Sequence, residues 1–374
     1  MSGYVVNPLP PKTELESIKI LKKLSNAHRY LAELKGMAAT IPNENILINT
    51  LALQEAKDSS AIENIITTQD ELFKTLLLDE HFTNAAAKEV SNYVEALKHG
   101  FQLVRNNKFL SSNHILEIHK ILIQNDAGYR KLPGTSLINE KTGEKVYTPP
   151  QNYQAIVDLM VNLEKFINNE SMLDADPLIK MAIIHFQFES IHPFYDGNGR
   201  TGRILNILFL VMNDLLDLPI LYLSRYIIKH KGDYYKLLQN VRDNNNWEDW
   251  IFYLLSGVEQ IAKETIELIR NIRQLMQTYK QRIRKELPKI YSQDLLNNLF
   301  KHPYTKIEFL MSDINVTRLT AQRYLEQLVE FELLDKQKIW RTNYYINTPL
   351  YLLFKGDTIA GDTLPIKTVN PPQV

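Results

Sequence analysis

One stretch of twelve residues, 192–203, concentrates side chains that could carry out chemistry. It reads HPFYDGNGRTGR and combines an imidazole, a carboxylate, several glycines and two arginines. A histidine such as His192 can take up a proton near neutral pH. A carboxylate such as Asp196 is a typical Mg²⁺ ligand beside phosphate oxygens, and paired arginines bind such oxygens in bidentate fashion. The combination predicts a nucleotide held by its phosphates, a metal ion, and a base that activates a hydroxyl group.

The elements on either side must position this stretch. An apolar helix is predicted over 177–190, and a second helix near Thr201 buries Ile204, Leu205, Leu208 and Phe209. The segment DGNGR is then a tight loop at a helix N-terminus, where free N–H groups and the helix dipole favour an anion. We expect Gly197 and Gly199 to take positive φ, so that their N–H groups converge. Arg200 and Arg203 are three apart and share one helix face.

Each of these features has an ordinary explanation when it is taken alone. A histidine before a loop is most often structural, Gly-Asn-Gly is usually a turn, and paired arginines usually form a solvated face. Their coincidence within twelve residues favours a functional site.

The stretch resembles the full signature of the Fic family, H-P-F-x-[DE]-G-N-G-R-x-x-R, at all nine specified positions. Segments 147–150, 224–238 and 247–258 are also similar to the family, so the resemblance covers residues 50–260. It implies a mainly α-helical fold, a Fic-type helical bundle with a β-hairpin flap. It also implies an enzyme that transfers AMP from ATP to a Tyr, Ser or Thr hydroxyl of a target protein and of itself, releasing pyrophosphate.

The resemblance also implies a role for each position. His192 would be the general base that deprotonates the target hydroxyl, and Asp196 would hold Mg²⁺ between the α- and β-phosphates. Family members with lysine at the place of Gly199 are associated with phosphorylation, so glycine there favours adenylylation. The phosphates would be bound by the backbone of Gly197, Asn198 and Gly199 and by the Asn198 amide. The guanidinium groups of Arg200 and Arg203 would bind the β- and γ-phosphates.

A second constellation lies upstream, in SSAIENI at 59–65. Taken alone it is typical of a capping box at the start of a helix over 59–78, with Ser59 or Ser60 as cap and Glu63 in the first turn. Beside the Fic signature, Ser59, Glu63 and Asn64 resemble the inhibitory motif [ST]-x-x-x-E-[GN]. The resemblance implies that Glu63 pairs with Arg203 and occupies the anion site that the γ-phosphate needs. In some relatives the same glutamate helps water to remove AMP, so a de-AMPylase that uses this site remains an alternative.

Strand signals are few, and two of them form one expected hairpin. Short β-prone runs at 136–138 and 145–148 flank a turn at Gly143. This hairpin is expected to act as a flap whose exposed edge aligns a target segment by β-augmentation. Ile138 and Tyr147 are candidates to contact the target or the adenine, and simple packing is an equal alternative.

The C-terminal part shows three helices followed by a hairpin from residue 288, which is the order of a winged helix-turn-helix. Asn315 or Thr317 is expected to cap the third helix. A DNA-binding regulator with a nucleotide-sensing Fic core is therefore a rival function. Residues 301–345 carry seven Lys or Arg against six Asp or Glu, a small excess of positive charge for a DNA-binding surface. A protein contact, including a homodimer, is favoured over DNA.

Composition bounds the remaining possibilities. Lys plus Arg and Asp plus Glu both total 43, which argues against bulk electrostatic binding to nucleic acid or membrane. The absence of cysteine excludes disulfides and fits the cytoplasm. The apolar stretch 204–221 is interrupted by Asn and Asp, so no membrane span is expected. The expected organisation is an N-terminal helical region with the inhibitory helix, a Fic core, a linker helix, a winged-helix-like domain and a tail, at 1–110, 111–260, 261–287, 288–354 and 355–374.

Overall fold

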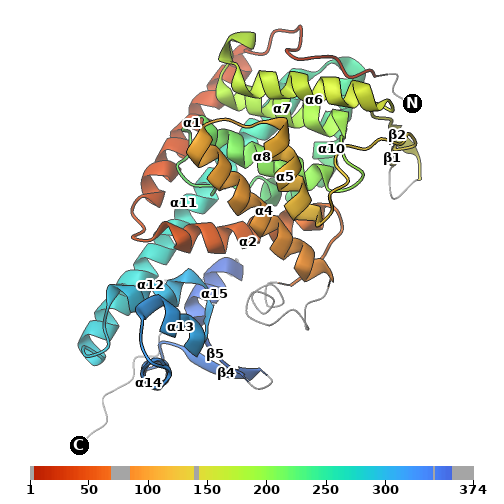
Figure 1. Cartoon of the computed structure of the whole chain (residues 1–374). Coiled ribbons are helices and arrows are strands. Elements are labelled where there is room, and N and C mark those ends of the chain that lie inside the picture. Colours follow the sequence, from red (N-terminus) through yellow and green to blue (C-terminus); the bar gives the residue numbers. More distant parts are fainter. Residues whose placement is uncertain (1–3, 69–84, 139–142, 340–341, 356–374) are drawn as a thin grey trace, which may run out of the picture. The chain divides into compact units, whose positions relative to one another are not determined.

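The computed structural model is mainly helical (Figure 1), and it describes residues 4–68, 85–138, 143–339 and 342–355. The chain divides into two compact units. The first comprises Met1–Gly36 and Leu51–Thr265, and the second comprises Met37–Thr50 and Ile266–Val374. Within the described ranges, no helix is long and apolar enough to cross a membrane.

The first unit is built mainly from helices. Helices α2 (Glu44–Ile62) and α11 (Trp247–Glu286) contribute residues to both units. The others that lie wholly or almost wholly in the first unit are α1 (Ile18–Ala38), α4 (Ala85–Asn107), α5 (Ser112–Ile123), α6 (Tyr153–Asn168), η2 (Glu170–Met172), α7 (Pro177–Ile191), α8 (Asn198–Met212), α9 (Ser224–Lys229) and α10 (Lys231–Asn244).

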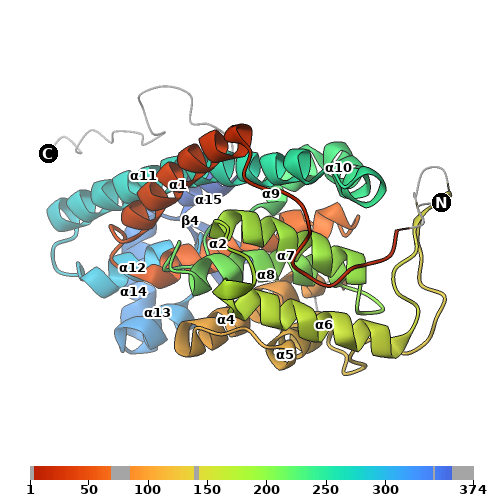
Figure 2. The ribbon, with the colours of Figure 1, turned by 90° about the horizontal axis from the view of Figure 1, so that it is seen from above.

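Helices α7 and α8 form the centre of this unit. Every residue of α7 from Leu178 to Ile191 is buried, so the helix shows no polar face, as expected for a helix surrounded by others. It packs against α6 and α8, and α8 also packs against α4 and α5, as both views show (Figures 1 and 2). Gly100 permits the approach of α4 to α8, because a Cβ there would lie 2.6 Å from Leu208 Cδ1.

Local sequence explains where the central helices begin. The Asp176 side chain accepts a hydrogen bond from Leu178 N at 2.8 Å, and Pro177 follows as the first residue of α7. Helix α8 begins at Asn198, three residues before the predicted start near Thr201. The central polar residues of the twelve-residue stretch therefore lie in the first turn of α8.

The helix predicted over 59–78 is wrong at its start. Helix α2 runs without interruption from Glu44 to Ile62, so Ser59 lies in its last turn and Glu63 follows its end. Residues 65–68 are not helical, and residues 69–78 lie outside the described part. The Ser and Glu spacing therefore marks a helix C-terminus here, and no capping box forms.

The predicted hairpin is confirmed. Strands β1 (Leu137–Ile138) and β2 (Lys145–Tyr147) pair antiparallel, with Leu137 opposite Tyr147. Gly143 has a φ of 71°, the left-handed conformation that glycine adopts without steric cost. Residues 139–142 lie outside the described part.

The second unit contains the predicted helices and hairpin together with two further elements. Thr317 caps α14 by accepting a hydrogen bond from Thr320 N, whereas Asn315 ends α13 in the left-handed conformation. Strand β3 and helix α15 were not predicted, and the antiparallel sheet has the order β3-β5-β4. The elements are α12 (Gln293–Lys301), β3 (Tyr304–Thr305), α13 (Ile307–Ile314), α14 (Arg318–Glu330), β4 (Asp335–Ile339), β5 (Thr342–Ile346) and α15 (Thr348–Lys355).

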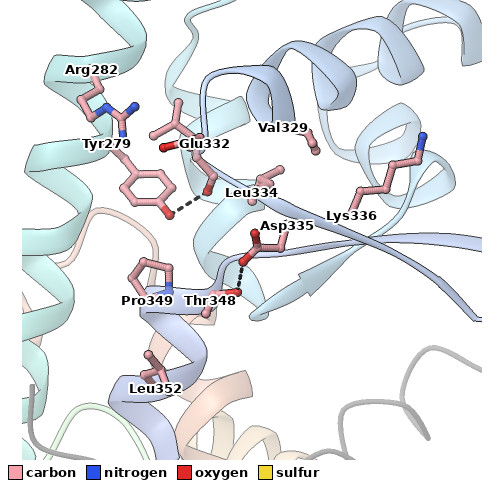
Figure 3. Close-up of a pocket in the computed structure, with 11 residues that line it drawn as sticks. Tyr279, Arg282, Val329, Glu332, Leu334, Asp335, Lys336, Thr348, Pro349 and Leu352 are labelled. Carbon is pink, nitrogen blue, oxygen red and sulfur yellow. Dashed lines mark hydrogen bonds between the residues drawn. The ribbon is translucent and has the colours of Figure 1, made fainter. Parts of the chain in front are cut away.

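A cavity of about 360 Å³ lies within the second unit (Figure 3). Its polar groups are engaged by the protein itself. The Tyr279 hydroxyl lies 2.8 Å from Leu333 O, the Arg282 guanidinium donates to Phe331 O at 2.6 Å, and the Thr348 hydroxyl donates to Asp335. These contacts join α11 to the turn that follows α14, and α15 to β4, which is a structural role.

Candidate active site

The candidate catalytic loop, residues 192–197 between α7 and α8, begins with an unusual backbone conformation. His192 caps α7 with φ 49° and ψ 60°, and its N–H donates to Phe188 O at 2.9 Å. A non-glycine residue in the left-handed region is held there only when its surroundings fix it, and such residues are frequent at functional sites. The loop is therefore closely determined at the position of the candidate base.

Arg130 is one of the groups that fix this conformation, and sequence reasoning missed it. Its Nε donates to His192 O at 2.8 Å, and its backbone N–H donates to Pro193 O at 2.8 Å. Its Nη2 also donates to Pro150 O. The side chain is buried. One arginine thus joins the loop to the segment that follows the hairpin.

His192 itself is placed as a neutral base. Its Nδ1 is buried and has no hydrogen-bond partner in the described part of the chain. Burial, with the nearby charges of Arg130 and Arg242, lowers the pKa of His192 to about 4. The imidazole is therefore neutral at pH 7 and has a lone pair available to accept a proton.

His119 on α5 supports the other end of the loop. Its ring stacks on Phe194, with centroids 3.6 Å apart and planes within 6°. Its Nε2 lies 3.0 Å from Asp196 O, a contact in which a neutral ring donates. Burial lowers the pKa of His119, which favours that neutral form. This residue too was missed, because nothing in the sequence links position 119 with position 196.

The roles of Asn198, Gly197 and Gly199 in the structure differ in part from the expectation. The Asn198 side chain accepts from Phe194 N at 2.8 Å and donates to Phe194 O at 2.9 Å, so its amide holds the loop closed. Gly197 has φ 71° as predicted, and a Cβ there would lie 2.5 Å from Ile123 Cδ1. Gly199 is helical, so the positive φ predicted for it is wrong. A Cβ there would lie 2.6 Å from Glu63 Oε1 and 2.8 Å from Arg203 Nη1, so these two side chains would have to move.

The two arginines lie on the first turns of α8 and are almost fully buried, at 1% and 3% exposure for Arg200 and Arg203. Arg203 Nε donates to Ser59 Oγ at 2.7 Å, and its Nη2 donates to Ser59 O at 3.0 Å and to Glu63 Oε1 at 2.7 Å. Buried guanidinium groups need such compensation, because an unpaired buried charge costs several kcal/mol.

Glu63 contacts both arginines, whereas the sequence predicted a contact with Arg203 alone. Its second oxygen, Oε2, accepts from Arg200 Nε at 2.7 Å. Each oxygen of this carboxylate therefore serves a different guanidinium group. Charge-assisted hydrogen bonds of this length are among the strong ones in proteins.

Arg200 has two further acidic partners. Its Nη1 donates to Glu89 Oε2 at 2.7 Å, and its Nη2 lies 3.3 Å from Asp196 Oδ1. Glu89 lies on α4, and sequence reasoning missed it because an isolated glutamate on a surface helix looks like any solvated residue. All three nitrogens of Arg200 thus point at carboxylates from three separate segments.

The end of α2 places Glu63 through a helix-capping motif. The N–H of Asn64 donates to Ala61 O at 3.1 Å, and the N–H of Ile65 donates to Ser60 O at 3.1 Å. This is the Schellman pattern, in which the residue after the C-cap is left-handed. Asn64 has φ 63°, and Asn is one of the few residues that take this conformation readily. Asn64 therefore fixes the direction in which Glu63 leaves the helix.

Asp196 is the candidate metal ligand, and its side chain is 70% exposed. Its Oδ1 accepts from Gly197 N at 2.6 Å. No group of three or more His, Cys, Asp or Glu that could hold a metal ion occurs in the residues that the structure describes. A single exposed carboxylate nevertheless fits Mg²⁺, which combines one or two carboxylates with phosphate oxygens and water.

A buried carboxyl group, Glu189, lies beneath this site. Its Oε1 has no hydrogen-bond partner in the described ranges. Burial raises the pKa of Glu189 to about 7, although the charge of Arg203 opposes the shift. This carboxyl is one of the few ionisable groups of the first unit expected to change its charge near neutral pH.

The pKa of Glu189 predicts how stability depends on pH. Between pH 4.5 and 7 the folded chain retains a proton that the unfolded chain has released, so the free energy of unfolding falls as the pH rises. One proton contributes a slope of at most about 1.4 kcal/mol per pH unit. We expect Glu189→Gln to flatten this dependence in urea unfolding at several pH values. Glu14→Gln, at an exposed glutamate, serves as control, and equal slopes in both variants would contradict the expectation.

The flap candidates behave differently from each other. Ile138 is 57% exposed, in keeping with a docking role, but Tyr147 is buried at 2% exposure. The Tyr147 hydroxyl donates to Ser190 O at 2.8 Å, and the Arg242 guanidinium lies 4.0 Å from the centre of its ring. The expectation that Tyr147 contacts a target or adenine is therefore replaced by the packing alternative. Its burial fixes the base of the hairpin to the end of α7.

Several basic side chains of the second unit are already paired with acids. Arg318 donates to Glu308 at 2.6 Å, Lys301 lies 3.1 Å from Asp313, and Lys336 lies 2.5 Å from Glu326. These ion pairs reduce further the charge that helix α14 and the β4-β5 hairpin could offer to DNA phosphates.

Three family models match the chain. Residues 21–102 match the Fic/DOC family N-terminal model, and residues 109–210 match the Fic/DOC family model. Residues 275–350 match the C-terminal domain of the SoFic-like protein adenylyltransferase. The second match includes the whole stretch 192–203 with its base, carboxylate and arginines.

Curated proteins with similar sequences are named protein adenylyltransferases. A probable protein adenylyltransferase of Aquifex aeolicus is 32% identical over 188 residues, which cover 48% of this chain and 54% of that protein. The protein adenylyltransferase Fic of Aedes aegypti is 28% identical over 165 residues, which cover 43% of this chain and 30% of that protein. The chain thus spans about half or less of the length of these relatives.

Solved structures show the same fold. A Fic family protein of Desulfovibrio desulfuricans G20 matches with a TM-score of 0.58 at 18% identity, over 90% of this chain and 98% of that one. A Fic domain containing signaling protein of Bacteroides thetaiotaomicron matches with a TM-score of 0.51 at 20% identity, over 66% and 97% of the two chains.

Proposed function

Because this chain carries Fic N-terminal, Fic and SoFic-like C-terminal domains, we propose that it is a protein adenylyltransferase. It transfers AMP from ATP to the hydroxyl group of a Tyr, Ser or Thr side chain, on a target protein and on itself. The single observation that carries this proposal is the catalytic loop, which joins a neutral, partly buried histidine to two buried arginines at a helix N-terminus.

The reaction needs a base, and His192 supplies it. The target hydroxyl oxygen attacks the α-phosphorus, the new O–P bond forms, and the bond to the β-phosphate oxygen breaks. Pyrophosphate leaves with the electron pair of that bond, while the hydroxyl proton passes to His192. Its neutral ring and the left-handed backbone that fixes its position support this role.

The phosphates bind at the start of α8. Gly199 leaves the space beside the Arg203 guanidinium free of a side chain, and the helix N-terminus favours negative charge. Arg200 and Arg203 supply the guanidinium groups for the β- and γ-phosphates. Glu63 occupies both of them in this structure, which supports an inhibited resting state.

Asp196 would hold Mg²⁺, which neutralises phosphate charge and helps the pyrophosphate to leave. Its exposed carboxylate at the edge of the arginine pair supports this assignment. Arg200 Nη2 lies 3.3 Å from the same carboxylate, so Asp196 and Arg200 are held together before the nucleotide arrives.

The β-hairpin is the proposed docking edge for the target. Ile138 is exposed there, while the buried Tyr147 anchors the opposite strand to the core. A target strand added to this edge would gain register from main-chain hydrogen bonds. The hydroxyl to be modified could then be aligned with His192.

The test follows labelled phosphate with Mg²⁺ present. Label transferred from the α-phosphate of ATP to protein, and lost with His192→Ala, supports the proposal. Label transferred from the γ-phosphate alone would indicate a kinase. Absence of any label in the Glu63→Gly variant, with retention of specific DNA, would favour a nucleotide-sensing regulator.

A further expectation concerns the capping residue Asn64. A β-branched residue resists the left-handed conformation, so Asn64→Val should disturb the end of α2 and loosen Glu63. We expect AMP transfer to rise about fivefold, the effect of roughly 1 kcal/mol. Asn64→Gly is the matched control, because it loses the same side chain and keeps the conformation. Equal rates in the two variants would show that the cap does not position the glutamate.

A further inference from the structure

Arg200 has more acidic partners than autoinhibition by Glu63 alone requires. Glu63 binds its Nε at 2.7 Å, Glu89 binds its Nη1 at 2.7 Å, and Asp196 lies 3.3 Å from its Nη2. Arg203, by contrast, has a single carboxylate within ion-pair distance in the described part of the chain, which is Glu63; the buried Glu189 and Glu55 act on it from farther away. The two guanidinium groups are therefore held unequally.

Removal of Glu63 would release them unequally as well. Arg203 would keep its hydrogen bonds to Ser59, at 2.7 and 3.0 Å, and would have no carboxylate in direct contact in the described part of the chain. Arg200 would remain bound to Glu89 and Asp196. A phosphate that approaches Arg200 must then displace the carboxylate of Glu89 or accept repulsion from it.

From this geometry we infer that Glu89 is a second carboxylate that competes with the nucleotide phosphates, acting on Arg200 alone. The inference rests on the proposed function and adds to its regulation. Full access to both arginines then requires two carboxylates to move away from the guanidinium groups. One is Glu63, which follows the end of α2, and the other is Glu89, in the first turns of α4.

The position of Glu89 suits such a role. Its side chain is 39% exposed, so it can rotate into solvent when a phosphate arrives, whereas Arg200 is held at 1% exposure. An exposed partner contributes less than a buried one, because water screens the pair. The effect of Glu89 should therefore be smaller than that of Glu63, and it should be visible mainly after Glu63 is gone.

The alternative is that Glu89 holds Arg200 in its productive orientation. The two roles predict opposite results for Glu89→Gln in the Glu63→Gly background. Competition predicts that the Kd and the KM for ATP fall about threefold to tenfold, while kcat changes little. Positioning predicts that kcat falls and that the Kd for ATP rises, because a loosened arginine binds phosphate less well.

The experiment compares Glu63→Gly, Glu63→Gly/Glu89→Gln and Glu63→Gly/Glu95→Gln. Glu95 is an exposed glutamate of the same helix, so its variant is matched in charge and location. The readouts are the Kd for ATP with Mg²⁺ by calorimetry and the kinetics of AMP transfer. A Glu89→Asp variant keeps the charge but shortens the side chain, so it should behave like Glu89→Gln if the direct contact matters.

Tighter ATP binding in the Glu89 variants alone supports the inference. Unchanged binding, or an equal change with Glu95→Gln, overturns it. If no variant transfers label, the proposed function fails, but the binding measurement still decides the role of Glu89. Thermal unfolding of each variant identifies any general loss of folding.

Discussion

Replacement of Glu63 by glycine should raise AMP transfer about tenfold to a hundredfold. Glu63 accepts two charge-assisted hydrogen bonds of 2.7 Å, from Arg200 Nε and Arg203 Nη2. Hydrogen bonds to charged groups are worth about 1.5–3 kcal/mol, and each 1.4 kcal/mol is a factor of ten. Because the Glu63 side chain is 25% exposed, the lower part of that range applies.

The measurement is the initial rate of α-phosphate label transfer to protein at ATP concentrations below the KM. Glu63→Gln is the informative control, since it keeps the shape and removes the charge. We expect it to lie between the unchanged chain and Glu63→Gly. A rate in Glu63→Gly no higher than in the unchanged chain would falsify the proposed inhibition.

Replacement of His192 by alanine should reduce AMP transfer by a factor of about 10²–10⁴, the usual contribution of a general base. The effect must be measured in the Glu63→Gly background, where the rate is high enough to show the loss. The proposed phosphate ligands Arg200 and Arg203 are held by Ser59 and by carboxylates, and their contacts do not involve this ring. ATP binding should therefore change little, and the loss should appear in kcat.

His99→Ala is a suitable control, because His99 lies on the surface of α4 and contacts Glu117 at 3.2 Å. It should leave both rates unchanged. If the His192 variant retained more than a tenth of the activity, another group would have to accept the proton.

The central fold and the catalytic loop could be predicted from the sequence because they depend on local patterns. The apolar run of α7 and the residues from His192 to Arg203 lie within one short segment. The distance along the chain between base, carboxylate and arginines is therefore small. The hairpin could be predicted for the same reason, with Gly143 marking its turn.

The end of α2 could not be predicted, because the spacing of Ser59 and Glu63 fits either end of a helix. A capping box places such a glutamate in a first turn, whereas the structure places it after a last turn. The contacts of Arg203 with Ser59 Oγ and Ser59 O favour the second arrangement, and they join residues 144 positions apart. Local sequence contains no information on such a contact.

The remaining differences have the same physical origin. Glu89 and Arg200 are 111 positions apart, and His119 and Asp196 are 77 apart. Tyr147 could not be assigned to the core from its strand alone. The sequence of a two-stranded hairpin does not show which of its faces packs against the rest of the protein.

The missing side chain of Gly199 bears on how inhibition could be lost by mutation. Glu63 Oε1 occupies the space in which a Cβ would lie, at 2.6 Å, and the proposed phosphates approach the same turn of α8. A side chain at this position would press on the flexible ends of Glu63 and Arg203, so Glu63 would have to turn away from the arginine. Inhibition could therefore also be lost by substitution at Gly199, besides substitution of Glu63 or of the residues that orient it.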